Sequence, residues 1–233
     1  MIIRNILTAV GCLLATTLSA QTRLAGYEYG SATAPTWQEW QQPELLGYNK
    51  LQPHACFTSF ASEGEAKGVL PEKSSYWQSL DGKWKFHFAK NPDARPKDFF
   101  QTAYPDQGWD EVEVPMSWNI YGLQKDGSQK YGTPIYVNQW VIFKYNIAVG
   151  DWKNGVMREP PKDYTTYEYR NEVGSYRRAF TLPQNWKGRE VYISFDGVDS
   201  FFYLWVNGHY VGCSKDSRDV AEFDISQWAK PGH

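Results

Sequence analysis

Two short polar stretches of the sequence hold side chains of the types that recognise sugars. The first reads S-K-D-S-R-D, contains Asp216 and lies between two strand-like stretches. A carboxylate can accept hydrogen bonds from two hydroxyls or ligate a hard cation, and Arg218 could hold such a loop by pairing with a neighbouring acid. The second reads Y-G-T-P-I-Y-V-N-Q-W, in which Asn138 follows a short apolar strand and offers an amide that both donates and accepts. The plainer alternative for Asp216 is a solvated turn in which it caps its own backbone.

The rest of the sequence lacks the patterns of familiar catalytic centres. No serine stands in G-x-S-x-G, and there is no phosphate-binding glycine loop and no zinc-ligand spacing. We expect His54, His87 and His209 on loops or strand faces. Glycoside chemistry needs two carboxylates facing each other in a cleft, and the sequence places no such pair. On these patterns alone the chain contains no assignable catalytic residue.

The composition favours a β fold and excludes some partners. The chain has 233 residues, of which 42% are hydrophobic and 17% aromatic. Aromatic side chains suit half-buried pleated surfaces; they also suit sugar stacking, although filling a core accounts for most of them. A net charge of −2 provides no electrostatic footprint for nucleic acid.

Strands must position the two polar stretches. From residue 79 the segment S-L-D-G-K-W-K-F-H-F alternates apolar and polar side chains, as a half-buried strand does. The same reasoning predicts strands at 109–114, 175–182, 190–195 and 222–226, with Phe223 and Ile225 buried. Polar, irregular segments are expected at 122–132 and 150–171.

The clearest local signal is F-F-Y-L-W-V-N-G-H-Y-V-G, from residue 201. Residues 201–206 are apolar on both faces, which is typical of a central strand. Asn207 and Gly208 form the favoured pair for a type I′ hairpin, because both positions need a positive φ. Short strands at 8–15-residue spacing, and no amphipathic helix of useful length, predict an antiparallel β-sandwich or jelly roll.

The first residues carry the features of an export signal. Residues 1–20 combine one positive charge, an apolar stretch too short to span a membrane, and Ala20 before a plausible cleavage point. The alternative, a lipoprotein signal at A-V-G-C, would leave almost no apolar region before the cleavage site. We therefore predict a periplasmic or extracellular protein without a membrane span. Cys56 and Cys213 form no disulfide framework and are expected as unpaired, partly buried thiols.

Several of these stretches resemble one enzyme family. D-G-V-D-S-F-F-Y-L-W-V-N-G-H-Y-V-G-C-S-K-D-S-R-D-V-A-E-F-D-I-S is similar to the sugar-binding jelly roll of glycoside hydrolase family 2 β-galactosidases. Further matches occur in family order: W-Q-E-W-Q-Q-P-E-L-L-G-Y-N-K-L-Q-P-H, S-L-D-G-K-W-K-F-H-F, V-E-V-P-M-S-W, P-I-Y-V-N and N-E-V-G-S-Y-R-R-A-F. The resemblance covers about residues 37–233. Residues 21–75 are polar and weakly patterned; they could hold a short turn of helix, but we interpret them as an extended amino-terminal arm that wraps something, and W-Q-E-W-Q-Q-P-E-L-L-G-Y-N-K-L-Q-P-H is similar to the arm of the family. The resemblance covers the arm and the domain after it. It also implies a galactose-binding-like jelly roll at 76–233 that lacks its last strands.

The resemblance also assigns roles to the two polar side chains. Asn138 would contact the bound β-galactoside. Asp216 would contact the galactose and ligate a monovalent cation, Na⁺ or K⁺. Both would reach into an active site of a (β/α)₈ barrel that carries the acid/base and nucleophile glutamates and a Mg²⁺ site. The mechanism there is retaining.

That barrel is not in this sequence, so the resemblance implies an inactive piece of an exported β-galactosidase. Its partners would be the substrate and the remaining domains, and the full-length protein would be a candidate homo-oligomer. Two alternatives stay open: a stand-alone carbohydrate-binding module, and the same domain of a β-glucuronidase or β-mannosidase. The combination of P-I-Y-V-N with K-D-S-R argues against the β-glucuronidase or β-mannosidase alternative.

Overall fold

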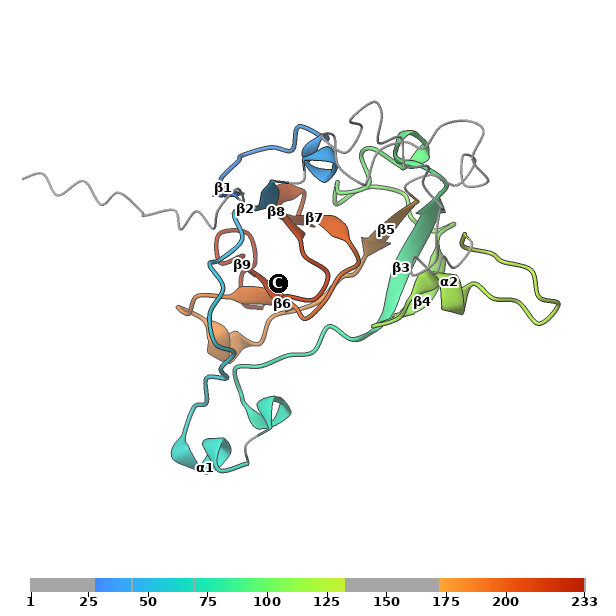
Figure 1. Ribbon diagram of the computed structural model, residues 1–233. Helices are drawn as coiled ribbons and strands as arrows, with labels where there is room; N and C mark the ends of the chain where they lie inside the picture. The colour runs from blue at the N-terminus through green and yellow to red at the C-terminus, as the bar shows by residue number, and fades with distance from the viewer. Residues whose placement is uncertain (1–27, 43, 69, 133–171, 233) are drawn as a thin grey trace, which may run out of the picture.

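The computed structural model describes residues 28–42, 44–68, 70–132 and 172–232 (Figure 1). The predicted signal at 1–20, the irregular segment at 150–171 and Asn138 lie outside these residues. Within the described residues, strands dominate and each α or 3-10 helix has only three or four residues. No helix there is long and apolar enough to cross a lipid bilayer.

The largest sheet of the described chain contains four strands in the order β1-β2-β8-β7. These are β1 (Glu28–Gly30), β2 (Leu45–Tyr48), β8 (His209–Lys215) and β7 (Phe201–Val206). The β7–β8 hairpin turns at Asn207 and Gly208, whose φ angles of 50° and 84° confirm the predicted pair of positive values.

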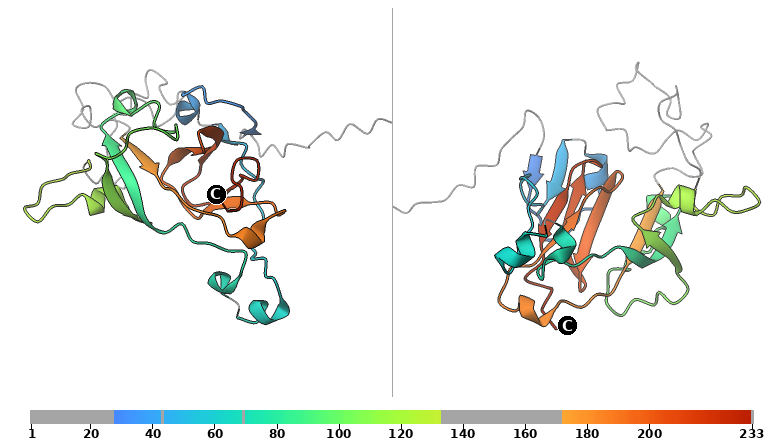
Figure 2. Two further views of the ribbon diagram at one scale, coloured as in Figure 1. Left: turned by 180° about the vertical axis from the view of Figure 1, so that it is seen from behind. Right: turned by 90° about the horizontal axis from the view of Figure 1, so that it is seen from below.

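Two smaller sheets complete the fold (Figure 2). One has the order β4-β3-β5, with β4 (Asp110–Val114), β3 (Gly82–Ala89) and β5 (Val173–Arg177). The other pairs β6 (Tyr192–Phe195) with β9 (Ala221–Asp224). Among the described strands every pair is antiparallel except β1 with β2, which confirms the predicted all-β, mainly antiparallel class. Closure as a jelly roll stays a prediction.

The connecting segments contain short helical turns. In chain order these are η1 (Glu39–Gln41), α1 (Glu63–Ala66), η2 (Pro71–Lys73), η3 (Pro92–Ala94), α2 (Trp118–Tyr121) and η6 (Gln184–Trp186). The turn η1 lies in the part of the arm where the sequence allowed a short turn of helix. The segment with α1 and η2 projects from the body at the bottom of Figure 1.

The core of the structure lies at apolar positions that the alternating sequence pattern predicted. One buried cluster joins β6, β7, β8 and β9 and includes Phe223 and Ile225, both buried as predicted. A second cluster surrounds Phe86 of β3, whose ring is fully buried against Tyr131 and Tyr176. Burial of this apolar area is the main favourable term in folding.

The amino-terminal arm is part of the main sheet, not only a wrapping segment. β2 pairs with β8 through Gly47↔Ser214 and Tyr48↔Cys213. The amide of Asn49 donates to the carbonyl oxygens of Val211 and Ala32, each at 2.7 Å. Asn49 has a φ of 56°, a left-handed conformation that asparagine tolerates better than most residues.

A buried carboxylate fixes the beginning of the arm. Glu39 is fully buried and accepts hydrogen bonds from the Tyr203 hydroxyl at 2.6 Å and the Thr36 amide at 2.7 Å. Burial opposes ionisation of Glu39, but these hydrogen bonds outweigh it, so the pKa of its carboxyl lies below the ordinary value. Next to it, the Trp37 ring stacks on Trp205 with centroids 5.6 Å apart.

Two predictions about strands were wrong. In the described chain β7 pairs only with β8 and is the last strand of its sheet, not a central one. Its apolar residues are explained by packing: Phe202 lies against Phe195, and Trp205 stacks on Phe100. The strand predicted at 175–182 ends at Arg177. There the Arg178 guanidinium donates to the carbonyls of Leu80 and Asp81 and ties the chain to the start of β3.

The two thiols also differ from expectation in one respect. Neither cysteine is in a disulfide. Cys213 is buried in β8, but Cys56 is exposed rather than partly buried. Burial raises the pKa of the Cys213 thiol, which keeps it protonated and unreactive.

The hydrogen bonds of Glu39 predict how removal of the Tyr203 hydroxyl changes the stability of the protein. Tyr203→Phe removes one donor from a buried charge and is expected to lower the free energy of unfolding by about 1–3 kcal/mol. The measurement is urea unfolding, with limited proteolysis of the arm as a second readout. Because the pKa of Glu39 is depressed in the folded state, its hydrogen bonds stabilise the protein above the unfolded pKa. That contribution is lost as the pH falls through the folded value.

A matched control is Tyr192→Phe. The Tyr192 hydroxyl also donates to a carboxylate, Glu190, at 2.6 Å, but this side chain is 44% exposed. We expect its loss to change stability by less than about 0.5 kcal/mol. Equal effects of the two substitutions would contradict the role given to the buried carboxylate.

Candidate functional site

Asp216 lies where the central strand of the main sheet ends. It follows Lys215, the last residue of β8, and begins a turn in which the Asp219 amide donates to the Asp216 carbonyl at 3.3 Å. Its φ of 78° is left-handed, which an aspartate tolerates better than most residues. The side chain is exposed. The strand therefore presents this carboxylate to solvent.

The carboxylate of Asp216 is not used by its own loop. Among the described residues no side-chain or backbone group donates a hydrogen bond to it, so the self-capping alternative is not what the geometry shows. Arg218 is exposed and forms no ion pair with a described acid, contrary to the loop-holding role considered for it. The carboxylate is thus available to a ligand.

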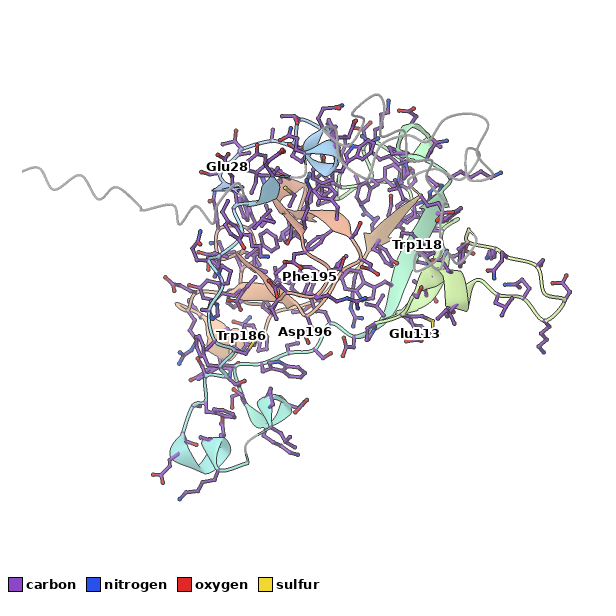
Figure 3. All side chains as sticks on the ribbon, in the orientation of Figure 1. Glu28, Glu113, Trp118, Trp186, Phe195 and Asp196 are labelled. Atoms are coloured by element: carbon purple, nitrogen blue, oxygen red, sulfur yellow. The ribbon has the colours of Figure 1, made fainter. Side chains whose placement is uncertain are left out.

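The turn rests on a neighbouring loop from β6. Figure 3 shows Phe195 and Asp196 close to the middle of the molecule, where this loop begins. A methyl group placed on the next residue, Gly197, would lie 2.9 Å from the carbonyl oxygen of Ser217. This separation is shorter than a normal contact, so the backbone at Gly197 packs directly against the Asp216 turn. Only a residue without a side chain allows this close packing.

The charges of Asp216 and Asp219 affect the pKa values of two arm residues. Burial lowers the pKa of the Lys50 ammonium, and the charges of Asp219 and Asp216 act in the opposite direction. Burial raises the pKa of the Tyr29 hydroxyl, and the same two carboxylates add to that shift. The Lys50 nitrogen lies 5.7 Å from the centre of the Tyr29 ring. The arm and the Asp216 turn therefore share one electrostatic environment.

Asn138 lies outside the described residues, so its position relative to Asp216 stays a prediction. The chain just before it is firmly held. The buried Tyr131 donates its hydroxyl to Asp110 at 2.7 Å and accepts at its carbonyl from the Asn119 amide at 3.1 Å. Gly132 then packs against the carboxylate of Glu172, so residues 132 and 172 lie beside each other.

The monovalent cation site expected at Asp216 stays a prediction. Hard cations take several oxygen ligands, and the exposed Asp216 carboxylate can supply one of them. No group of three or more His, Cys, Asp and Glu side chains with metal-binding geometry exists in the described chain. A cation held at Asp216 would need its other oxygen ligands from a sugar, from water or from elsewhere.

Sequence reasoning missed the contribution of the arm to this site. Lys50 and Tyr29 carry no recognisable motif, and a polar segment of this composition predicts a surface position for both. The only local signal was N-K-L directly after the short L-L-G-Y stretch, which is too brief to be assigned as a strand.

Comparison with known proteins identifies the family of this chain. The family model described as "Glycosyl hydrolases family 2, sugar binding domain" matches residues 77–233. The chain belongs to glycosyl hydrolase family 2. Curated relatives in that family include the β-galactosidase of Priestia megaterium, which is 38% identical over 87% of this chain. The β-galactosidase of Halalkalibacterium halodurans is 36% identical over 81%, and the β-galactosidase large subunit of Lactobacillus helveticus is 33% identical over 80%.

The chain spans a small part of these relatives. The aligned region covers 18%, 16% and 28% of their respective lengths. A solved family 2 member from Bacteroides cellulosilyticus matches 67% of the chain at 19% identity, with a TM-score of 0.40. That likeness is too low to carry an argument. The family model thus establishes the family, and its match to residues 77–233 is to the sugar-binding domain.

The support of the Asp216 turn by Gly197 is testable. Gly197→Ala would push against the Ser217 carbonyl and is expected to cost about 1–3 kcal/mol of stability, as overpacking does. It should also shift the amide resonances of residues 216–219 in NMR spectra. Gly108→Ala is the control, because an added methyl there meets nothing within 4 Å. Unshifted resonances of the turn in Gly197→Ala would refute the contact.

Proposed function

We propose that this chain is the amino-terminal, sugar-recognising part of an exported β-galactosidase that releases terminal β-D-galactose with retention of configuration. The relatives support the substrate class, since those cited above are named β-galactosidases. The observation that carries the proposal is the exposed, left-handed Asp216, whose carboxylate has no partner in the described chain. A side chain held in this way at a strand end is suited to a ligand.

The chemical role of Asp216 follows from its type and position. An ionised carboxylate accepts two strong hydrogen bonds and donates none, so it suits hydroxyl groups of a sugar. A monovalent cation bound there would help to hold sugar hydroxyls by ligating their oxygens. Asn138, from the segment that leaves Tyr131, would add an amide contact on the same sugar.

The bond-breaking residues belong to another part of the polypeptide. A retaining glycosidase needs a nucleophile and an acid/base carboxyl group about 5 Å apart, and we give neither role to a residue of this chain. We assign those groups, and a Mg²⁺ site, to a barrel domain outside this chain. The amino-terminal domain then orients the sugar. The binding energy of its contacts with the sugar contributes to catalysis.

The first 20 residues support a proposal about the cellular location of the protein. Their charge and apolar pattern support export to the periplasm or the exterior. The partners of this chain would be the β-galactoside and the remaining domains of the same enzyme. Relatives with a separately named large subunit make a multi-subunit assembly a reasonable extension.

Asp216→Asn tests the recognition role in a polypeptide that includes the catalytic domain. The neutral amide keeps the shape but loses the charge, and we expect kcat/KM for a chromogenic β-galactoside to fall about ten- to hundredfold. The response of the activity to added Na⁺ or K⁺ should diminish in parallel. The control is Asp93→Asn, which alters an exposed carboxylate on η3. Unchanged kinetics and an unchanged cation response in Asp216→Asn would remove the assignment.

The chain alone provides a second test. Assayed with the same chromogenic galactoside, the purified 233-residue chain is expected to show no turnover above buffer. Measurable hydrolysis that survives repurification would mean that a catalytic pair lies within this sequence. Calorimetry with galactose separates the alternatives, because tight binding by the chain alone would favour a stand-alone carbohydrate-binding module.

A further inference from the structure

Two sheets of the described chain each end in a strand with one unpaired edge. β7 is the last strand of the four-stranded sheet, and among the described residues it pairs only with β8. β5 is the last strand of the three-stranded sheet, and there it pairs only with β3. The free edge of a strand presents a row of backbone N–H and C=O groups that can pair with a further strand. β7 and β5 therefore offer two such rows.

One loop joins the ends of these two strands. Arg177, the last residue of β5, donates from its guanidinium to the carbonyl oxygens of Phe99 and Gln101. The centre of the Phe99 ring lies 5.4 Å from that of Trp205, near the end of β7. Both strands therefore run in the same direction, toward the loop at 99–104. Figures 1 and 2 show the sheet of β5 on the β7 side of the main sheet.

The hairpin geometry shows which amides of β7 point to its free edge. Val206 and His209 flank the two-residue turn, so they form a hydrogen-bonded pair. Amide directions alternate along a strand, so the amides of Trp205 and Tyr203 point away from β8. These two amides are donors for a strand on the other side of β7.

The chain that continues from β5 also lacks backbone partners. Within the described chain no backbone hydrogen bond involves residues 179–181. Phe180 is nevertheless partly buried, and it packs against the same core cluster as Leu204 of β7. Backbone groups that are removed from water without a partner are costly, so this segment favours an added strand. One core cluster lies under both free edges.

Gly232 marks where such a strand would begin. Its amide donates to the carbonyl oxygen of Leu182 at 2.9 Å. This carbonyl points to the side from which a new strand would pair, and by alternation the amide of Phe180 points to the same side. A chain that continued from Gly232 antiparallel to this segment would pass Phe180 and then the free edge of β5.

We propose that the free edges of β7 and β5 form a slot for one further β-strand, antiparallel to both, supplied by the same polypeptide after residue 233. Its carbonyls would accept from the amides of Tyr203 and Trp205, and its apolar side chains would cover the core at Phe180 and Leu204. The aligned region is only 18% of the Priestia megaterium relative, which leaves ample chain for such a strand.

This inference rests on the proposed function, in which the chain is one part of a larger enzyme. It goes beyond the jelly roll expected from the sequence, because it names the two edges, the direction and the first hydrogen bonds of the strand that joins the two sheets. The slot would make the main sheet continuous with the sheet of β5, and it would tie the sugar-binding domain to the chain that follows.

The test extends the purified 233-residue chain by about 20 residues, enough for a turn and one strand of about five or six residues. The added residues are copied from the Priestia megaterium β-galactosidase, immediately after the region that aligns with this chain. Amide hydrogen exchange is followed by NMR. We expect the Phe180, Tyr203 and Trp205 amides to exchange at least about tenfold more slowly than in the unextended chain, because each gains a backbone hydrogen bond. Amides of β1, at the opposite edge of the main sheet, should exchange at unchanged rates.

Two controls separate strand pairing from other effects of added chain. The first is the same extension with two central residues of its strand replaced by proline, which cannot donate to a ladder. It should leave all three amides as they are in the unextended chain. The second is an extension copied in the same way from the Halalkalibacterium halodurans relative, so that a mismatch in one foreign sequence does not decide the result. It should slow the same amides.

Three outcomes would overturn the proposal. The first is unchanged exchange of the three amides in both unsubstituted extensions. The second is equal slowing by the proline-containing extension. The third is slowing in the unextended chain that grows with protein concentration and accompanies a dimer in sedimentation, because the occupant would then be a second copy of this chain.

The result is distinguishable from failure of the proposed function. If Asp216→Asn leaves catalysis and its cation response unchanged, the β-galactosidase assignment fails, and slowed exchange in the extended chains still supports the slot. If Asp216→Asn acts as expected and neither extension slows exchange, only the slot fails.

Discussion

The close approach of β2 to β8 is the constraint on which the rest of the structure depends. A methyl group on Gly47 would lie 2.7 Å from the Cys213 carbonyl oxygen, and one on Gly212 would overlap the Tyr48 carbonyl. Only glycine leaves room for the two backbones at these points. This pairing brings the arm into the main sheet and gives β8 a neighbour on both edges. It also leaves the backbone of Gly47 bare, and the Cβ and Cδ atoms of Lys50 lie against it.

Polar contacts of the arm then decide its path over the sheet. Glu39 is buried under Tyr203, Asn49 bonds to the backbone of Val211, and His54 contacts the Glu222 carboxylate at 2.7 Å. Each is a long-range contact, and buried polar groups are costly when left without partners. The arm and the sugar-binding domain consequently form one unit. Asp216 differs because its carboxylate is exposed and has no hydrogen-bond partner among the described residues.

Much of the fold could be predicted because its signals are local. Alternation with period two located β3, β4, β6 and β9, and the Asn-Gly pair located the β7–β8 turn. The unassigned strands β1 and β2 and the edge position of β7 have a common cause. β1 and β2 are only three and four residues long, too short for a periodic signal, and β7 is apolar on both faces because distant aromatic side chains cover it. Pairing partners and coverage depend on contacts between segments far apart in the chain.

The sequence by itself determined the strand pattern, the family and the two polar stretches to which a sugar-binding role is assigned, because short-range periodicity and motifs encode these features. Only the tertiary structure decided that Asp216 is exposed and has no hydrogen-bond partner among the described residues, and that Lys50 and Glu39, charged residues of a polar arm, are buried. Burial and electrostatic neighbours are properties of packing across the sheet. Composition indicates which charges a chain carries, but the fold sets how strongly each acts, because the local dielectric depends on what surrounds it.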